Sequence, residues 1–192
     1  PLHVAASKGW VEVMAVLHVE GGADVDSEDV EKRTPLFAAC DAGKVAAAKL
    51  LQSFGARSDT ALIHGITKDN SQVIRMILDM DPGVLRADPM RFLAEAIRQE
   101  SLWGLRLLLE RGADVLSPET KSKALRLALT VRGNRGKVAM ILRLLLKDGA
   151  VGVNMELADE AGVEKMRPLF LACIQGNAEA VRVLVDSRAD VN

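Results

Sequence analysis

The segment from residue 34 to residue 59, TPLFAACDAGKVAAAKLLQSFGARSD, constrains the fold more than any other part of the sequence. Thr34 and Pro35 predict a helix start, because a threonine hydroxyl accepts hydrogen bonds from unpaired N–H groups and proline suits the first helical turn. Gly43 ends this first helix, and a second helix with one apolar face follows from Lys44 to Ser53. Two such short helices cannot bury their apolar faces alone, so the segment requires copies of itself on either side.

Copies of this template occur along the whole chain. We place six repeats at residues 1–33, 34–59, 60–90, 91–122, 123–166 and 167–192. A leucine fills the third slot of every first helix: Leu2, Leu36, Leu62, Leu93, Leu125 and Leu169. A small residue fills the sixth slot: Ala5, Ala39, Gly65, Ala96, Ala128 and Ala172. A branched aliphatic residue recurs late in the second helix: Leu17, Leu51, Ile77, Leu108, Leu145 and Leu184. Packing between repeats explains this agreement, since large residues fill space and small ones let helices approach.

These motifs, together with the endings GADVD at residues 22–26 and ADVN at 189–192, resemble the ankyrin repeat. The resemblance covers the whole chain. It implies an all-α repeat solenoid of stacked helix-turn-helix pairs with few, irregular β-hairpin fingers. The match is weaker in repeats three to five, where Asp69 and Glu100 replace the mid-unit glycine and other residues replace the motif proline. Those other residues are Ala61, Phe92 and Ala124.

Composition and charge fit a thin helical array. Apolar residues make up 49% and aromatic residues 3% of the 192 positions, and we predict one continuous domain over residues 1–192. The net charge of −1 gives no general attraction to nucleic acid, and no run approaches the roughly 18 apolar residues that span a membrane. We therefore predict a monomer that neither binds nucleic acid nor inserts into a membrane. Both ends are ordinary repeats, so we expect the sequence to be a segment of a longer chain.

Two cysteines, Cys40 and Cys173, occupy the same small-residue slot in distant repeats. This placement predicts two buried thiols in a reducing compartment. Together with the repeat class, it favours an intracellular location, in the cytoplasm or alternatively the nucleus.

Two junctions between repeats are long enough for projecting fingers that contact a partner. The first finger, Ser27 to Arg33, carries the candidate contacts Glu28, Asp29, Glu31 and Arg33. The second, Met155 to Met166, carries Glu156, Asp159 and Glu160. A solvated charged turn is an equally good interpretation of the first finger. We expect the apolar residues of the second finger to fold back on the stack, with presentation to a partner as the alternative; they are Met155, Leu157, Val163 and Met166.

Two other junctions pair a helix-capping residue with a proline, at Asp88-Pro89 and Ser117-Pro118. Each pair predicts a helix that begins early, in what is normally hairpin. Between repeats two and three nothing is inserted, so we expect no finger there.

The ends of the first helices line the concave palm in the proteins that this chain resembles. Here those slots include Asp41, Lys68, Arg98 and Gln175, and a glycine-rich insertion that we expect to be mobile adds Arg132 and Arg135. The resulting surface is mainly basic between two acidic fingers, which predicts a partner protein with acidic residues. A solvated charged face is the alternative interpretation. Trp103 lies in an outer slot of a second helix, where it packs on the next repeat or marks a separate convex contact.

Catalytic chemistry has little support in the sequence. No two of the three histidines have a metal-binding spacing, and the sequence contains no P-loop, HExxH or GxSxG motif, so we predict neither a cofactor nor an enzyme. His64 and Glu95 share one slot in adjacent repeats, which suggests a structural hydrogen bond. The leading hypothesis is a protein-interaction scaffold that uses its palm and fingers. The alternative is a regulatory or targeting domain of a larger enzyme, channel or transferase.

Overall fold

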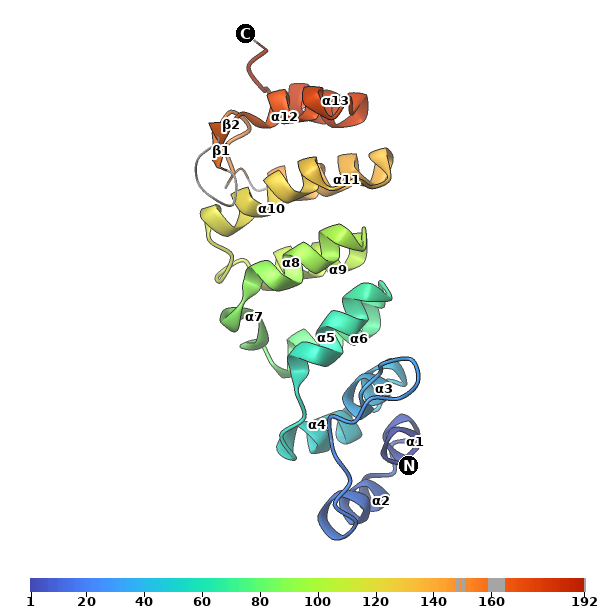
Figure 1. The fold of residues 1–192 in the computed structure, drawn as a ribbon. Helices are drawn as coiled ribbons and strands as arrows, with labels where there is room; N and C mark the ends of the chain where they lie inside the picture. The colour runs from blue at the N-terminus through green and yellow to red at the C-terminus, as the bar shows by residue number, and fades with distance from the viewer. Residues whose placement is uncertain (148, 150, 159–164, 192) are drawn as a thin grey trace. The chain divides into compact units, whose positions relative to one another are not determined.

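A computed structural model describes residues 1–147, 149, 151–158 and 165–191. The described chain is mostly helical and has the predicted architecture of repeated helix pairs (Figure 1). The first three pairs are α1 (Leu2–Lys8) with α2 (Val11–Ala15), α3 (Pro35–Asp41) with α4 (Val45–Ser53), and α5 (Ser58–Thr67) with α6 (Ser71–Met80). The next three are α8 (Pro89–Arg98) with α9 (Leu102–Arg111), α10 (Pro118–Thr130) with α11 (Arg135–Leu146), and α12 (Pro168–Ile174) with α13 (Ala178–Asp186). A π-helix, η1 (Val16–Glu20), continues α2, and the short α7 (Val84–Ala87) was not predicted.

The helix pairs form two compact units, Pro1–Ala87 (unit 1) and Asp88–Asn192 (unit 2). In unit 1, α3 packs against both α1 and α5, and α4 packs against α2. In unit 2, α10 packs between α8 and α12, while α11 packs between α9 and α13. First helices thus meet first helices in both units, and second helices meet second helices in unit 2 and between α2 and α4, whereas α6 packs against α5 and α3. The single domain expected over residues 1–192 stays a prediction.

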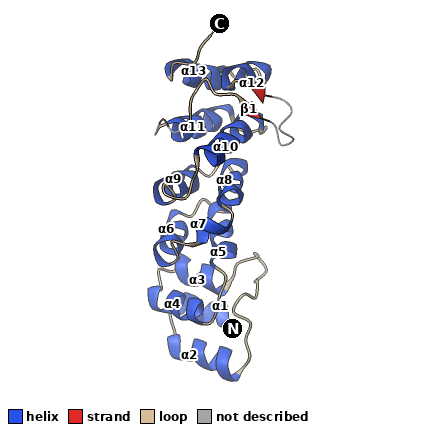
Figure 2. Cartoon of the chain, turned by 90° about the vertical axis from the view of Figure 1, so that its left-hand side faces the viewer, coloured by secondary structure: helices blue, strands red, loops and turns tan. Residues whose placement is uncertain are grey.

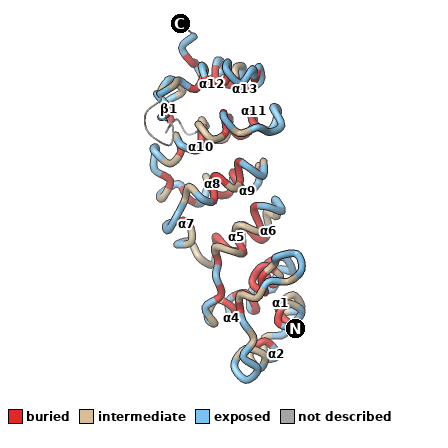
Figure 3. The backbone as a smooth tube through the Cα atoms, viewed as in Figure 1, coloured by how far each residue is buried: buried red, intermediate tan, exposed pale blue. Residues whose placement is uncertain are grey.

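The repeated slots supply the core, as the buried residues in Figure 3 illustrate. Every residue of the small slot is buried, from Ala5 to Ala172, which confirms close approach between helices. The third-slot leucines are buried except Leu169, which is intermediate. The second-helix aliphatic residues are buried except Leu17, which is also intermediate and lies in η1.

Capping side chains set most of the predicted helix starts. Thr34 Oγ1 accepts from the Phe37 N–H at 3.3 Å, and α8 and α10 begin at their prolines behind the caps Asp88 and Ser117. Both of these helices therefore begin early, as predicted. Helix α5 begins at Ser58, two residues before the repeat boundary placed at Thr60.

That earlier start of α5 has a local electrostatic reason. Asp59 lies in the first turn of the helix, where a carboxylate is favoured by the unpaired N–H groups of a helix start. The Arg57 guanidinium, at the cap position, pairs with this carboxylate at 2.8 Å.

The residues that replace the mid-unit glycine keep its backbone conformation. Gly43 and Gly176 have φ of 67° and 59°, and Asp69 and Glu100 have φ of 49° and 52°. Side chains rarely adopt this left-handed conformation. The turn geometry is therefore preserved in repeats three and four, at a cost in backbone strain.

Only the second finger contains strands among the described residues. Strands β1 (Leu157–Ala158) and β2 (Lys165–Met166) pair antiparallel, with Leu157 opposite Met166. Figure 2 shows β1 in red on an otherwise helical chain. Leu157 is 2% exposed, and its carbonyl accepts from Arg126 Nη1 on α10 at 2.8 Å. The prediction that the apolar residues fold back is confirmed for Leu157. Val163, Asp159 and Glu160 lie outside the described residues.

The prediction of two buried thiols is half wrong. Cys40 is fully buried, whereas Cys173 is exposed, and neither forms a disulfide. Cys173 and Phe170, which is 56% exposed, line one open pocket together with residues of β2.

Candidate protein-interaction site

The first finger is a turn organised around Asp29. The Asp29 carboxylate accepts from the N–H groups of Glu31 and Arg33 at 2.9 and 3.0 Å, and from Arg33 Nε at 2.8 Å. Burial raises the pKa of this carboxyl, but the hydrogen bonds from Arg33 and Glu31 and the charge of Arg33 outweigh burial and lower the pKa to about 2. Asp29 and Arg33 thus hold the finger together.

The remaining charges of the first finger also pair within it. Lys32 Nζ lies 3.2 Å from Glu28 Oε2, and Arg33 Nη1 lies 3.6 Å from Glu31 Oε2. Exposed pairs of this kind contribute about 0–1 kcal/mol, so a partner can displace them easily. Val30 at the tip is fully exposed and was not predicted as a contact. An apolar residue within a charged turn is the signal that would have identified it.

The predicted palm residues of unit 1 divide into a structural and an accessible residue. Asp41 Oδ1 accepts from Asn70 Nδ2 at 2.6 Å, and the Asp41 carbonyl accepts from Gln72 Nε2 at 2.9 Å. Asp41 therefore links its repeat to the next one. Lys68 is exposed at the end of α5, with no ion-pair partner in the part of the chain that the structure describes.

The predicted palm residues of unit 2 come together more closely. Arg132, Arg135 and Gln175 line one open cavity of about 490 Å³, formed where the α10–α11 connection meets the turn between α12 and α13. Asn177 lines it as well, and its side chain caps α13 by accepting from the Ala180 N–H at 3.1 Å. The sequence-predicted residues from two repeats thus share one site.

The connection that carries these arginines is held by several hydrogen bonds, and its expected mobility stays a prediction. Helix α11 already begins at Arg135, behind Asn134, whose side chain accepts from the N–H groups of Gly136 and Lys137 at 3.0 and 3.2 Å. The Glu100 carboxylate accepts from the Asn134 N–H and lies 3.4 Å from Lys137 Nζ. A capping residue such as Asn134 can be recognised in the sequence. Its contact with Glu100 could not be predicted, because residue spacing does not show which side chain of the preceding repeat reaches this connection.

Arg98 lies at the end of α8, two residues before Glu100, and is not among the residues that line the cavity. We call Arg98, Arg132, Arg135 and Gln175 the loop site. All four are exposed, and none of the three arginines has an ion-pair partner among the described residues. The planar guanidinium of arginine binds carboxylates through two parallel hydrogen bonds, and arginine is enriched at interaction hot spots. The loop site is therefore suited to acidic side chains.

The other predicted finger contact, Glu156, is exposed next to β1, and the remaining acidic candidates Asp159 and Glu160 lie outside the described residues. Trp103 is 50% exposed, and the Arg106 guanidinium lies 5.7 Å from its ring centroid. Half of the Trp103 surface thus remains open on α9.

The slot that His64 and Glu95 share in adjacent repeats has a different environment in each unit. The His64 ring packs edge-on against Phe37 with centroids 4.8 Å apart, and its Nε2 is buried without a hydrogen-bond partner. Burial lowers the pKa of His64, and the positive charges of Lys68 and Arg33 lower it further. Glu95 Oε1 accepts from Gln99 Nε2 at 2.9 Å. The expected bond between His64 and Glu95 stays a prediction.

The described residues contain no group of three or more histidine, cysteine, aspartate or glutamate side chains placed to hold a metal ion. No helix within the described ranges has the length and apolar character to cross a membrane.

Comparisons with known proteins match this arrangement. A family profile described as ankyrin repeats in three copies matches residues 1–59, and a single ankyrin repeat profile matches residues 165–192. The crystal structure of the ankyrin repeat domain of Bcl-3, a member of the IkappaB family, is 28% identical, with a TM-score of 0.66 over 99% of this chain and 86% of that one. Residues 1–59 and 165–192 therefore match ankyrin repeat models, and the helix pairs of the chain have the ankyrin repeat fold.

Two curated proteins and a further solved structure are also similar to all or part of this chain. An ankyrin repeat domain-containing protein, SAT10, from Stachybotrys chartarum is 27% identical over all 192 residues. The serine/threonine-protein kinase VIK from Arabidopsis thaliana is 47% identical over 58 residues, or 30% of this chain. The chain spans only 8% and 13% of the length of these two curated relatives. An ankyrin repeat domain from Acinetobacter baumannii has the same fold, with a TM-score of 0.60 at 24% identity over 99% of this chain and 98% of that one.

Proposed function

We propose that this ankyrin array is a protein-interaction scaffold that binds acidic side chains of a partner protein at the loop site. The observation that carries the proposal is the set of exposed arginines Arg98, Arg132 and Arg135, which have no ion-pair partner among the described residues. The anchoring of the α10–α11 connection by Glu100 supports it, because an ordered loop loses less conformational entropy on binding. The fingers contribute further contacts, through Val30 in the first and Glu156 in the second.

The experiment begins with affinity capture to identify a binding protein, followed by titration calorimetry with that protein. Arg98→Ala combined with Arg132→Ala is expected to weaken binding by about 1 kcal/mol or more, roughly fivefold or greater. Arg188→Ala with Arg182→Ala is a matched control that removes two exposed arginines elsewhere in unit 2. Equal affinities for the loop-site variant and the wild type, with folding intact by circular dichroism, would place the interaction elsewhere on the chain.

A regulatory or targeting domain of a larger protein is the second candidate function. The kinase relative favours it, because its 58 matched residues are 13% of a protein named for phosphoryl-transfer activity. In that case the loop site binds a segment of the same polypeptide. The test is to add the purified array in trans to the remainder of its parent protein, with the loop-site double variant as control. Binding of the wild-type array alone would support the regulatory arrangement.

We also infer an intracellular location, in the cytoplasm or alternatively the nucleus. Free Cys40 and Cys173 support it, since unpaired thiols persist in reducing compartments. Imaging of the parent protein with a fluorescent tag tests this inference, and secretion would contradict it.

A further inference from the structure

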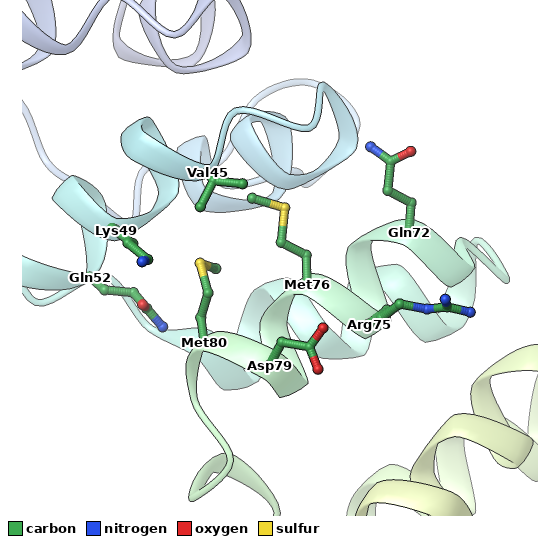
Figure 4. A pocket seen from close by; sticks show the side chains of 8 residues that line it. All are labelled: Val45, Lys49, Gln52, Gln72, Arg75, Met76, Asp79 and Met80. Atoms are coloured by element: carbon green, nitrogen blue, oxygen red, sulfur yellow. The ribbon is translucent and has the colours of Figure 1, made fainter.

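A groove lies between helices α4 and α6 on the exposed side of unit 1 (Figure 4). Its volume is about 720 Å³. Val45, which is 50% exposed, and the partly buried Met76 and Met80 give it an apolar lining. Methionine side chains are unbranched and polarisable, and they are frequent at surfaces that adapt to different ligands. The groove therefore offers apolar contact area to a binding partner.

Two amides at the walls of the groove are already used by the fold. Gln72 Nε2 donates to the carbonyls of Cys40 and Asp41 at 3.1 and 2.9 Å. Gln52 Nε2 donates to Ser58 Oγ at 3.2 Å. These bonds fix side chains of the wall in place, so the shape of the groove is set before anything binds.

The groove carries two positive charges. Lys49 and Arg75 line the groove, and both lack an ion-pair partner in the part of the chain that the structure describes. Each lies two residues before the recurrent aliphatic residue of its helix. In α9 and α13 the arginine in that slot pairs with a glutamate of its own helix: Arg106 with Glu110 and Arg182 with Glu179, each at 2.8 Å. The two groove cations are uncompensated, as is Arg143 of α11 among the described residues, but only the groove cations flank partly exposed apolar side chains in one groove. Asp79 also lines the groove and already has an interaction of its own.

We propose that this groove binds an acidic amphipathic segment of a partner protein. The apolar side chains of the segment lie on Met76 and Met80, and its carboxylates pair with Lys49 and Arg75. An amphipathic helix provides both groups, because residues at i, i+3, i+4 and i+7 share one face and the flanking positions remain charged. This surface is separate from the loop site, whose residues all belong to unit 2.

The test uses a fluorescein-labelled helical peptide with leucine on one face and glutamate on the flanks, titrated with the protein by fluorescence anisotropy. Lys49→Glu with Arg75→Glu is expected to weaken binding at least tenfold, and so is Met76→Ser with Met80→Ser. Arg143→Glu with Arg182→Glu is the matched control, since it reverses two exposed charges of the same slot in unit 2. The control variant is expected to retain affinity within about twofold.

A direct measurement accompanies the titration, so that a misfolded variant does not decide the result. In the wild-type protein labelled with ¹³C at the methionine methyls, the peptide is expected to shift the Met76 and Met80 resonances and to leave that of Met155 unchanged. Unshifted Met76 and Met80 resonances would overturn the proposal. Equal binding of a peptide with serine in place of leucine, or of one with lysine in place of glutamate, would also overturn it. An oligothymidine that displaces the peptide and shifts the same resonances would assign the groove to nucleic acid instead.

Discussion

Glu100 and Arg188 adopt the left-handed backbone conformation in unit 2, with φ of 52° and 67°. A residue with a side chain costs about 1–2 kcal/mol in this conformation, and glycine avoids that strain at an entropic cost of about 0.5–1 kcal/mol. The Arg188 side chain is exposed. Arg188→Gly is therefore expected to stabilise the protein by about 0.5–1 kcal/mol, as the difference between these two effects.

Glu100→Gly relieves the same strain and removes a useful carboxylate. That carboxylate is held at 18% exposure, accepts from the Asn134 N–H and pairs with Lys137. A hydrogen bond to a charged group contributes about 1.5–3 kcal/mol. The net expectation is a destabilisation of about 1–2 kcal/mol, opposite in sign to the effect of Arg188→Gly.

Urea unfolding at pH 7, monitored by circular dichroism, measures the free energy of unfolding of both variants. The values can be compared directly if the m-value is unchanged. Hydrogen exchange at the Asn134 amide reports on the contact itself. Exchange there should become faster in Glu100→Gly, which loses the acceptor of this N–H, and should stay unchanged in Arg188→Gly. Equal stabilisation by the two substitutions would show that the Glu100 carboxylate contributes nothing. A destabilised Arg188→Gly variant would refute the strain argument itself.

Three further outcomes follow from the same structure. Ala96→Leu places a large side chain in a fully buried slot and is expected to lower the free energy of unfolding, measured with urea, by about 1–3 kcal/mol. Lys68→Leu at an exposed site should be nearly neutral. Equal effects of the two substitutions would contradict the repeat register. Burial lowers the pKa of His64, so the folded state binds a proton less readily than the unfolded state, and the free energy of unfolding should fall as the pH drops below about 6.5. His64→Leu should flatten this dependence between roughly pH 7.5 and 5. Parallel pH profiles for the variant and the wild type would refute the assignment to His64. Ellman's reagent should modify Cys173 within minutes and spare Cys40 in the folded protein, and equal rates would contradict the assigned burial.

The repeat pattern predicted the fold because each slot has one physical requirement. A small residue is needed where helices touch, and Ala39 and Ala96 meet that need at 0% exposure. Local capping chemistry likewise predicted the starts at Pro89 and Pro118, since the cap and the proline are neighbours in sequence. The start of α5 at Ser58 could not be predicted in this way, because Arg57 and Asp59 favour it without any standard capping motif.

The candidate site was less predictable, because charge alone does not distinguish a binding residue from a structural one. Asp29 and Asp41 were both predicted as contacts, yet the first organises its own turn and the second links two repeats. Arg132 and Arg135 kept their predicted exposure and share a cavity with Gln175. What separates the two groups is the hydrogen-bond partner of each side chain, which depends on segments about 30 residues away or on the exact turn conformation.

Two copies of one motif show where such sequence reasoning ends. The segments 35–40 and 168–173 read PLFAAC and PLFLAC, and each forms the start of a first helix. In the first copy the Phe37 ring meets the edge of His64 and Cys40 is buried, and burial together with the charge of Asp41 raises the thiol pKa to about 12. In the second copy Phe170 is 56% exposed and Cys173 is accessible. Nearly identical local sequence therefore sets the helix and its slots, while the burial of a thiol in that slot depends on the side chains that pack against it.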